Sequence, residues 1–329
     1  MQLPTAADPF LSASLFAAGH LDSAIAKVLL PLAAAEPEAS FYFLRYGRGI
    51  EHLKLRFLGD PARAPQLRQK LTELAETFFG ELATFEPAVV GDPAKQPPAI
   101  DVEDEDLSLA RDRSLLFTTY RRSYIPFAGP PFLGDDALMA RASALLCRQS
   151  RLYFTLYDTG ETPSHKTRQN CLLRLIATGL PAFGIAETAW PTYLHYHRDW
   201  LIRWTLGAFA ADQQDRLAPA IEKFDQLAQA SSAAFGSLRS FFTASAKPFL
   251  PPHQEDLRNA LGDLGHRARE VGATAAPDID PYTSDASFLP LFKALHMAAN
   301  ALGLKMRDEA FAHHLLAAAL TATDGPKAE

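Results

Sequence analysis

The sequence predicts an α+β fold, in which a small antiparallel sheet from the N-terminal third packs on a large and mostly helical part. Residues 40–58 contain a strict period-two alternation, which is typical of strands. The stretch SLLFTTYRRSYI, within residues 109–125, is rich in strand-favouring residues. From Asp135 onward the apolar residues recur with helical spacing almost throughout. Strand signals therefore come early in the chain and helix signals dominate the rest.

Each early element has a local signal. A helix is expected at residues 22–35, with Asp22 or Ser23 as its N-cap. A hairpin follows over residues 40–58, turning at Gly47-Arg48-Gly49. A helix is then expected at residues 63–84, where leucines and a phenylalanine recur at helix spacing.

Segments rich in proline and glycine separate the remaining elements. Residues 86–107 combine Pro, Gly and an acidic cluster, which predicts a loop. A strand pair is expected at residues 109–125, before the break PFAGPP at residues 126–131. The later helices are expected at residues 135–158, 164–179, 185–209, 211–243, 253–271, 284–303 and 307–321.

Composition bounds the class of protein. The chain has 329 residues, 48% of them hydrophobic and 21% charged, which is enough to bury a substantial core. We expect one stand-alone domain over residues 1–329, sheet-rich over 1–130 and helical over 131–329. The formal net charge of −6 gives no general basic field, so a nucleic acid is not an expected partner.

Cysteine usage and the N-terminus indicate a cytoplasmic protein. Cys147 and Cys171 cannot make a disulfide framework and match no zinc pattern, so we expect no metal and no other cofactor. The N-terminal MQLPTAADPF lacks the basic and apolar segments of a signal peptide. No apolar run approaches the ~18 residues of a membrane span, so no membrane partner is expected.

The second strand of the hairpin is the most informative segment. Its side chains alternate, so His52, Lys54 and Arg56 share one face while apolar residues take the other. An ordinary amphipathic strand intersperses Thr, Ser, Glu and Lys on its polar face. Three cationic or titratable groups on one face predict an anion platform, and a solvated polar face is the alternative.

A second signal lies in the helix expected at residues 284–303. His296 and Asn300 are one turn apart amid Leu, Phe and Ala, so they share a helix face. One interpretation is a general acid–base histidine with Asn300 as its orienter or as a substrate contact. The other is a core histidine whose hydrogen bonds are satisfied.

A third cluster surrounds Tyr120. Arg121 and Arg122 lie between aromatic residues just before the break of the chain. In a strand they point to opposite faces, so one of them can join the anion platform.

The other histidine pairs do not indicate a site. His195 and His197 are two residues apart in a helical segment with no third ligand at motif spacing, so no metal site is predicted. His313 and His314 are expected at the surface or at an interface.

Three segments together resemble one family. Residues 41–46 and 52–57 are similar to its early signature, an aromatic strand ending in Arg-Tyr followed by His-Leu-Arg-Leu-Arg-Phe. Residues 295–303 are similar to its late signature, which contains His-Met and Asn-Arg. The middle signature falls on residues 120–129 and 146–150. The chain resembles the C-terminal, glutamate-eliminating domain of class I lanthipeptide dehydratases, which also occurs as a stand-alone thiopeptide-type bacteriocin biosynthesis protein.

The resemblance extends over about residues 22–321 and implies a function. In the family, this domain removes glutamate from glutamylated Ser or Thr of a precursor peptide and leaves dehydroamino acids. A base takes the Cα proton, and cations stabilise the enolate-like charge and the leaving carboxylate. The resemblance implies catalytic roles for His296, Arg56, Lys54 and Tyr120, and substrate-binding roles for His52, Arg45, Arg122 and Asn300.

The sequence departs from the family pattern at several of these positions. Lys54 replaces the first Arg of the strand, which keeps the charge but loses the bidentate fork. Ser123 and Pro126 stand where the middle signature has Glu and Arg, and Gln149 and Ala301 replace an Asp and an Arg. Thiopeptide pyridine synthases form a branch with this kind of change. They join two dehydroalanines by a formal aza-[4+2] cycloaddition and then release water and the leader peptide.

Three hypotheses follow, in the order in which we favour them. The chain is a pyridine synthase-like cyclase, or a glutamate-eliminating lyase that works with a separate glutamylating subunit, or a non-catalytic leader-binding partner of other maturation enzymes. All three imply a precursor peptide as partner, with a leader and a dehydrated core. An extended leader often binds by adding to a sheet edge.

Overall fold

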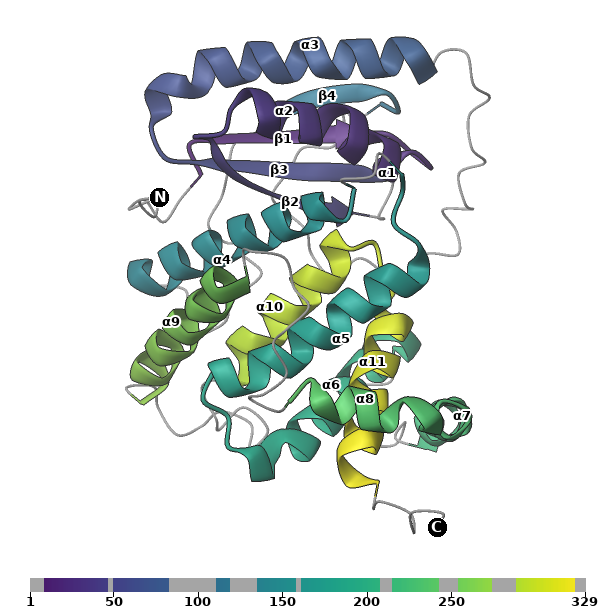
Figure 1. The fold of residues 1–329 in the computed structure, drawn as a ribbon. Coiled ribbons are helices and arrows are strands. Elements are labelled where there is room, and N and C mark those ends of the chain that lie inside the picture. The colour runs from purple at the N-terminus through teal and green to yellow at the C-terminus, as the bar shows by residue number, and fades with distance from the viewer. Residues whose placement is uncertain are drawn as a thin grey trace. The chain divides into compact units, whose positions relative to one another are not determined.

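The computed structural model describes residues 9–46, 50–82, 111–118, 135–157, 161–207, 215–242, 254–273 and 288–322 (Figure 1). Contacts within the chain divide it into two compact units, Met1–Pro163 and Ser164–Glu329, here called the sheet unit and the helical unit. The sheet unit holds an antiparallel sheet, and helices account for most of the other described residues. The predicted α+β class is confirmed, whereas the expectation of one domain over residues 1–329 stays a prediction.

The sheet has the strand order β2-β3-β1-β4, with every neighbouring pair antiparallel. The predicted hairpin is confirmed as β2 and β3, and its turn at residues 47–49 lies outside the described residues. The central strand β1 was not predicted, although its Leu-Ser-Ala-Ser-Leu alternates as regularly as β3. Only one strand of the pair expected at residues 109–125 is described. The strands are β1 (Leu11–Phe16), β2 (Ser40–Tyr46), β3 (His52–Leu58) and β4 (Ser114–Thr118).

The two faces of the sheet differ in chemistry. Register partners in an antiparallel pair lie on the same face. Ala13 of β1 pairs with Leu55 of β3 and with Phe117 of β4, which defines an apolar face. The helix α3 (Ala64–Leu82), predicted at residues 63–84, covers this face, because its Arg68 guanidinium lies 4.5 Å from the centre of the Phe117 ring. The opposite face is left to carry the polar residues.

The helix predicted at residues 22–35 forms, but with a wider turn inside it. It consists of α1 (Leu21–Ala24), the π-helical segment η1 (Ile25–Leu29) and α2 (Leu30–Ala35). Pro31 lacks an N–H group, and its ring clashes with the carbonyl group four residues earlier in a regular helix, so a π turn before it relieves the conflict. The predicted caps are wrong: His20 is the N-cap residue, without a side-chain bond.

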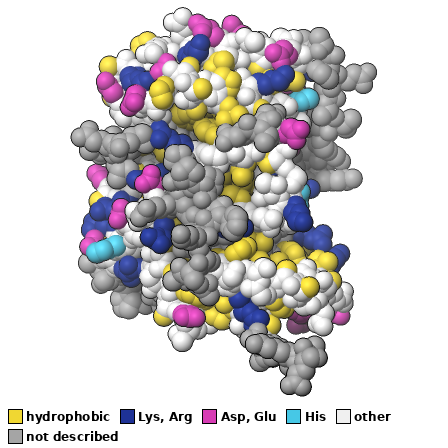
Figure 2. All heavy atoms as spheres, viewed as in Figure 1, with side chains coloured by type: hydrophobic (Ala, Val, Ile, Leu, Met, Phe, Trp, Pro, Cys, Tyr) yellow, Lys and Arg dark blue, Asp and Glu magenta, His cyan; other side chains and the backbone are white. Residues whose placement is uncertain are grey.

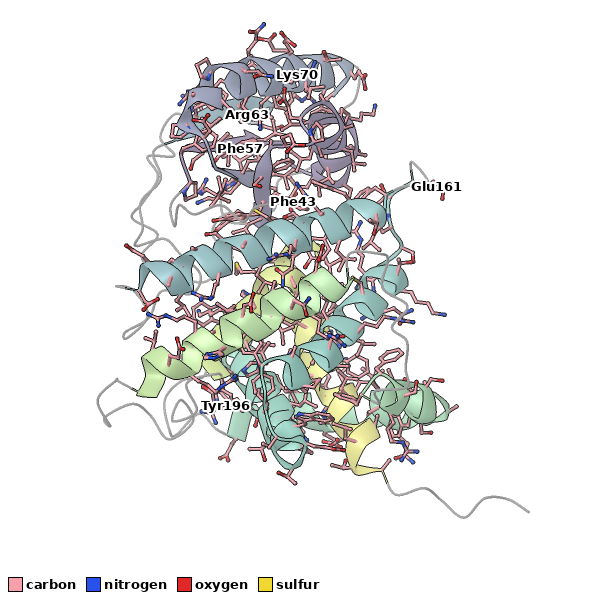
Figure 3. All side chains as sticks on the ribbon, turned by 60° about the vertical axis from the view of Figure 1, so that its left-hand side comes forward. Phe43, Phe57, Arg63, Lys70, Glu161 and Tyr196 are labelled. Carbon is pink, nitrogen blue, oxygen red and sulfur yellow. The ribbon has the colours of Figure 1, made fainter. Side chains whose placement is uncertain are left out.

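The outer edge of β2 is covered by α4 (Asp136–Thr155), predicted at residues 135–158 (Figure 1). The Phe43 N–H group donates to the Ser150 hydroxyl at 3.2 Å, in place of a neighbouring strand. The rings of Phe43 and Phe154 stack at a centroid distance of 5.7 Å, and Figure 3 shows Phe43 on the α4 side of the sheet. This edge of the sheet is therefore protected against strand addition.

The helical unit is organised around α11, which packs against α5, α6, α7 and α8. The single helix expected at residues 211–243 is wrong: α7 ends before Ser231, which leaves the helical conformation, and both the N–H group and the hydroxyl of Ser231 donate to the Leu227 carbonyl. Gly303 ends α10 with a left-handed φ of 72°, as its residue type predicts. The elements are α5 (His165–Ala182), η7 (Glu187–Ala189), α6 (Trp190–Leu206), α7 (Ala218–Ala230), η9 (Ser232–Ala234), α8 (Phe235–Ser240), α9 (Gln254–Ala273), α10 (Phe288–Ala301) and α11 (Met306–Thr321).

The described surface mixes charges of both signs. On the face shown in Figure 2, Lys and Arg side chains are interspersed with Asp and Glu side chains. Such a surface lacks the clustered basic stripe of a general nucleic-acid-binding protein on the side that is visible. Among the helices that the structure describes, none combines the length and the hydropathy needed to cross a membrane.

A histidine lies in the core of the helical unit. His197 of α6 is 0% exposed, and its ring packs 4.0 Å from the Tyr193 ring and 4.4 Å from the Phe292 ring, centre to centre. Burial lowers the pKa of His197 well below its ordinary value, and the nearby His313 and His296 lower it further. This histidine is therefore neutral in the folded protein at physiological pH.

The contact between Ser150 and β2 predicts a stability effect. The variant Ser150→Ala leaves the Phe43 N–H group buried without its acceptor, which costs about 1–3 kcal/mol. Urea unfolding measures the loss. The matched control is Thr77→Ala, whose exposed hydroxyl bonds only to its own helix. A loss no larger than that of the control contradicts the account of the β2 edge.

The core histidine predicts a pH dependence. Below the unfolded-state pKa of about 6.5, the unfolded chain binds a proton that folded His197 does not, so stability decreases as the pH falls. Between pH 7.5 and pH 5.5 this removes about 1.4 kcal/mol of unfolding free energy through one such histidine.

The variant His197→Phe keeps an aromatic ring and removes the titrating group. Between pH 7.5 and pH 5.5 its unfolding free energy should therefore fall by about 1.4 kcal/mol less than that of the wild type. Urea unfolding at the two pH values measures it. The control is His266→Phe, which changes a histidine whose side chain is 72% exposed. Equal pH dependence in the wild type and His197→Phe contradicts the prediction.

Candidate functional site

The predicted cationic strand face exists, and it is buried. His52, Lys54 and Arg56 share the face opposite the apolar one, and they are 1%, 2% and 4% exposed. The alternative of a solvated polar face is therefore wrong. Charged side chains are rarely buried to this extent unless polar or charged groups accompany them. We call this surface, with Ser12 and Ser14 of β1, the basic face.

Lys54 is held against an aromatic ring. Its Nζ atom lies 4.2 Å from the centre of the Tyr46 ring, which is a cation–π distance. The Tyr46 ring in turn stacks on the His52 ring, at 5.4 Å between centres and 17° between planes. The ammonium group therefore lies over the same stack that holds the imidazole.

The orientation of His52 is fixed by the backbone. Its Nδ1 atom lies 2.8 Å from the Ile50 carbonyl oxygen, and because a carbonyl only accepts, Nδ1 carries the proton. The Phe16 ring packs on the other flank, 4.6 Å from the imidazole centre. His52 is thus a rigid part of the basic face.

Two serines of β1 complete the basic face, and the sequence analysis missed them. Ser14 is the register partner of Lys54, and Ser12 is the register partner of Arg56. Both serines are buried, and the Ser12 hydroxyl has no hydrogen-bond partner in the described part of the chain. The Arg56 Nη1 atom donates to the Leu55 carbonyl at 3.1 Å. Cations beside hydroxyl groups can bind the oxygen atoms of an amide or a carboxylate.

Arg45 does not join the basic face. It is the register partner of Leu53, so it lies on the other face of the sheet. Its Nη2 atom donates to Asp22 Oδ1 at 2.6 Å and to the Tyr157 hydroxyl at 3.0 Å, while that hydroxyl donates to Asp22 at 2.7 Å. These bonds tie α1, β2 and the end of α4 together. Its substrate-binding role stays a prediction. The catalytic role of Tyr120 and the substrate-binding role of Arg122 also stay predictions, because both residues lie outside the described ranges.

The second group of predicted site residues belongs to the helical unit. His296 lies on α10, and its Nδ1 atom is 2.8 Å from Oε2 of Glu309 on α11. The His296 side chain is 25% exposed and that of Glu309 is 1% exposed. Asn300 is half-buried one turn further along α10. Sequence reasoning missed Glu309, although an acidic residue followed by the apolar run Ala-Phe-Ala was a usable signal.

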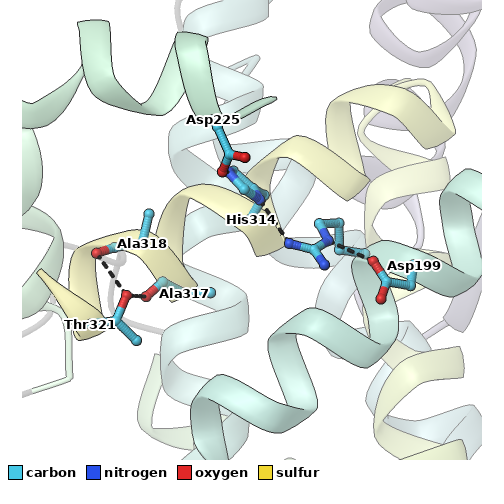
Figure 4. A network of polar contacts seen from close by, with 7 residues as sticks. Asp199, Asp225, His314, Ala317, Ala318 and Thr321 are labelled. Carbon is cyan, nitrogen blue, oxygen red and sulfur yellow. Dashed lines mark hydrogen bonds and ion pairs between the residues drawn. The ribbon is translucent and has the colours of Figure 1, made fainter. Parts of the chain in front are cut away.

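A polar network joins α6, α7 and α11 (Figure 4). Arg198 donates from Nε to Asp199 at 2.7 Å and from Nη1 to Nδ1 of His314 at 3.1 Å. The Nε2 atom of His314 lies 3.2 Å from Asp225. Burial and the Arg198 charge lower the pKa of His314. The expected surface position of His313 and His314 is wrong, because both are buried in helix packing.

The described residues include neither a reactive cysteine nor a group of side chains arranged to hold a metal ion. Burial raises the pKa of Cys147 and Cys171 to about 12, so neither is a thiolate near neutral pH. His195 and His197 lie on a helix, as predicted. Within the ranges that the structure describes, no three or more His, Cys, Asp or Glu side chains are grouped to hold a metal ion.

Comparisons with known proteins identify a family and similar folds. Residues 11–320 match the family model described as lantibiotic biosynthesis dehydratase C-term. A structure described as the pyridine synthase TbtD from thiomuracin biosynthesis is similar, with a TM-score of 0.63 and 18% identity over 94% of this chain and 96% of that one. The structure of TsrL is similar too, with a TM-score of 0.57 and 14% identity over 94% and 93% of the two chains. A search of the curated proteins finds no match. The chain belongs to the family of the lantibiotic dehydratase C-terminal domain.

Proposed function

We propose that this chain is a pyridine synthase-like cyclase that matures a ribosomal peptide of the thiopeptide type. Its substrate is a leader-bearing peptide with two dehydroalanines, which it joins into a pyridine-containing macrocycle while water and the leader are released. Membership of the family supports action on such a peptide. The fold shared with TbtD, described as a pyridine synthase, supports the type of reaction, but at 18% identity the site residues must carry the argument.

The observation that carries the proposal is the setting of Lys54. Its ammonium lies over the Tyr46 ring, and Lys54 is the register partner of Ser14 on the basic face. An ammonium is a point donor, whereas the bidentate grip on a leaving carboxylate requires the planar fork of an arginine. A point donor among hydroxyl groups suits the single oxygen of a peptide amide. The basic face is therefore better matched to amide polarisation than to the expulsion of glutamate.

The reaction needs little covalent chemistry from the protein. Much of the barrier lies in bringing two distant residues of one peptide into reacting geometry, and binding can supply a large part of that. Lys54 and Arg56 polarise peptide amides. His296 moves the proton from the amide nitrogen, and the hydroxyl later leaves as water. Tyr120 donates to a developing oxyanion, while His52, Arg45, Arg122 and Asn300 contact the peptide.

A second candidate is a glutamate-eliminating lyase. Arg56, buried on the basic face, supports it, because the fork of an arginine can hold the leaving carboxylate. His296 would then remove the Cα proton of a glutamylated residue. The two functions differ in the substrate consumed and in the product mass, so one assay separates them.

The cyclase proposal predicts the effect of neutralising Lys54. The variant Lys54→Met keeps the length of the side chain and removes the charge, and loss of one such donor should lower the rate of ring formation about 10²-fold. Mass spectrometry of a di-dehydroalanine peptide measures the appearance of the macrocycle and of the free leader.

The control for this test is Lys70→Met, which neutralises a lysine whose side chain is 39% exposed on α3. It should cyclise at the wild-type rate. A cyclisation rate of Lys54→Met within about twofold of the wild-type rate contradicts the role given to Lys54, because the loss of an oxyanion donor lowers the rate far more. Release of the glutamyl group from a glutamylated peptide, with the di-dehydroalanine peptide returned unchanged in mass, supports the lyase instead.

A further inference from the structure

Glu309 occupies a position that calls for an explanation. It lies in the first turn of α11 and is 1% exposed, although carboxylates are almost never fully buried without a partner. The N-terminal end of a helix carries unpaired N–H groups and a partial positive charge, which favour a carboxylate there. Asp308 already serves the helix end, because its Oδ2 atom accepts from the Lys305 N–H group at 3.0 Å. Capping therefore does not explain Glu309.

The contact with His296 does explain it. The 2.8 Å separation between Nδ1 and Oε2 is a hydrogen-bond distance. An ionised carboxylate only accepts, so His296 Nδ1 carries the proton, and the neutral imidazole keeps its lone pair on Nε2. The Phe292 ring, one turn earlier on α10, is nearly parallel to the imidazole, at 9° and 6.0 Å. The orientation of the ring is thus restrained by a bond on one atom and by an aromatic neighbour.

The neighbouring histidines, His197 and His313, do not bond to the Glu309 carboxylate. His313 donates from Nδ1 to the backbone carbonyl of Glu309 at 2.9 Å, not to its carboxylate. Burial lowers the pKa of His197 and that of His313, so both rings are neutral near pH 7 and supply no competing cation. The Oε1 atom of Glu309 is buried, and no described group bonds to it. The carboxylate therefore acts on His296 through Oε2.

We propose that Glu309 is a positioning residue, whose carboxylate fixes His296 as the Nδ1–H tautomer with Nε2 as the reacting atom. This inference rests on the proposed function for its catalytic consequence, but not for the tautomer. When Nε2 takes the amide proton, the imidazolium that forms is stabilised by the Glu309 carboxylate. The proton then passes from Nε2 to the carbonyl oxygen, which becomes the iminol hydroxyl, while the Nδ1 proton stays in place.

The tautomer is measured by nitrogen NMR of the intact protein labelled with ¹⁵N-histidine, above pH 8. The His296 signals are assigned by their loss in His296→Ala. The wild type should show the Nδ1–H form. The variant Glu309→Met, which has similar length and no acceptor, should shift the population toward Nε2–H. An Nε2–H tautomer in the wild type overturns the proposal whether or not any peptide is turned over.

A double-mutant cycle tests the catalytic consequence. Loss of a residue that orients a reacting histidine should lower the cyclisation rate on the order of 10²-fold in Glu309→Met. In the His296→Ala background, the same change should lower the rate no further. The matched control is Asp308→Asn, which removes a charge in the same helical turn and leaves His296 untouched. It should keep the wild-type rate and tautomer.

Other results overturn the proposal. A full rate in Glu309→Met contradicts it, and so does an added loss in the His296→Ala background, which would mean that Glu309 acts independently or only through the fold. If Glu309→Met does not fold, Glu309→Gln keeps an acceptor without the charge and should lower the rate less, again only when His296 is present. Failure of the wild type to cyclise any peptide counts against the proposed function, and the tautomer then decides the role of Glu309.

Discussion

The burial of cationic side chains on one face of a small sheet is the constraint on which this structure depends. Placing a single ion in the protein interior costs several kcal/mol even after relaxation. The sheet offsets part of this cost locally, because Tyr46 lies under the Lys54 ammonium and the serines of β1 line the same face. The apolar face, covered by α3, supplies the hydrophobic burial that keeps the strands paired. A face that is expensive to bury indicates a binding function more than a contribution to stability.

The helical unit buries histidines, and their surroundings differ from one histidine to the next. His197 is kept neutral by burial among aromatic rings, and His314 is fixed by Arg198 and Asp225. His296 alone of the buried and half-buried histidines discussed here has a side-chain carboxylate within 3 Å, and its side chain reaches the surface in part. That difference distinguishes His296 from the histidines that fill the core. We therefore propose acid–base chemistry for His296 and not for the other imidazoles of this cluster.

Much of the fold could be predicted because its signals are local. The β2–β3 hairpin follows from period-two alternation, α3, α4, α10 and α11 follow from helix spacing, and Gly303 marks the end of α10. β1 was missed because five of its six residues are Leu, Ser or Ala, which have little strand propensity of their own, and pairing on both sides stabilises it.

The site was predicted less well, because several of its residues come together only through tertiary contacts. Lys54 and Arg56 were found because a strand places alternate residues on one face. Ser12, Ser14 and Glu309 reach their partners only through tertiary contacts, across strands or between helices. Arg45 lies on the face of the sheet opposite the basic face, where its guanidinium bonds to Asp22. Its position in the family motif predicted a substrate-binding role, and the contact with Asp22 gives no evidence for that role.

We propose that the basic face of this family member serves amide activation and not glutamate expulsion. The most direct measurement gives the wild-type protein two peptides of one sequence, one with two dehydroalanines and one glutamylated, in separate reactions followed by mass spectrometry. The account predicts that the first loses water and its leader to become a macrocycle and that the second returns unchanged. Release of glutamyl groups from the second peptide, with the first left intact, would contradict it.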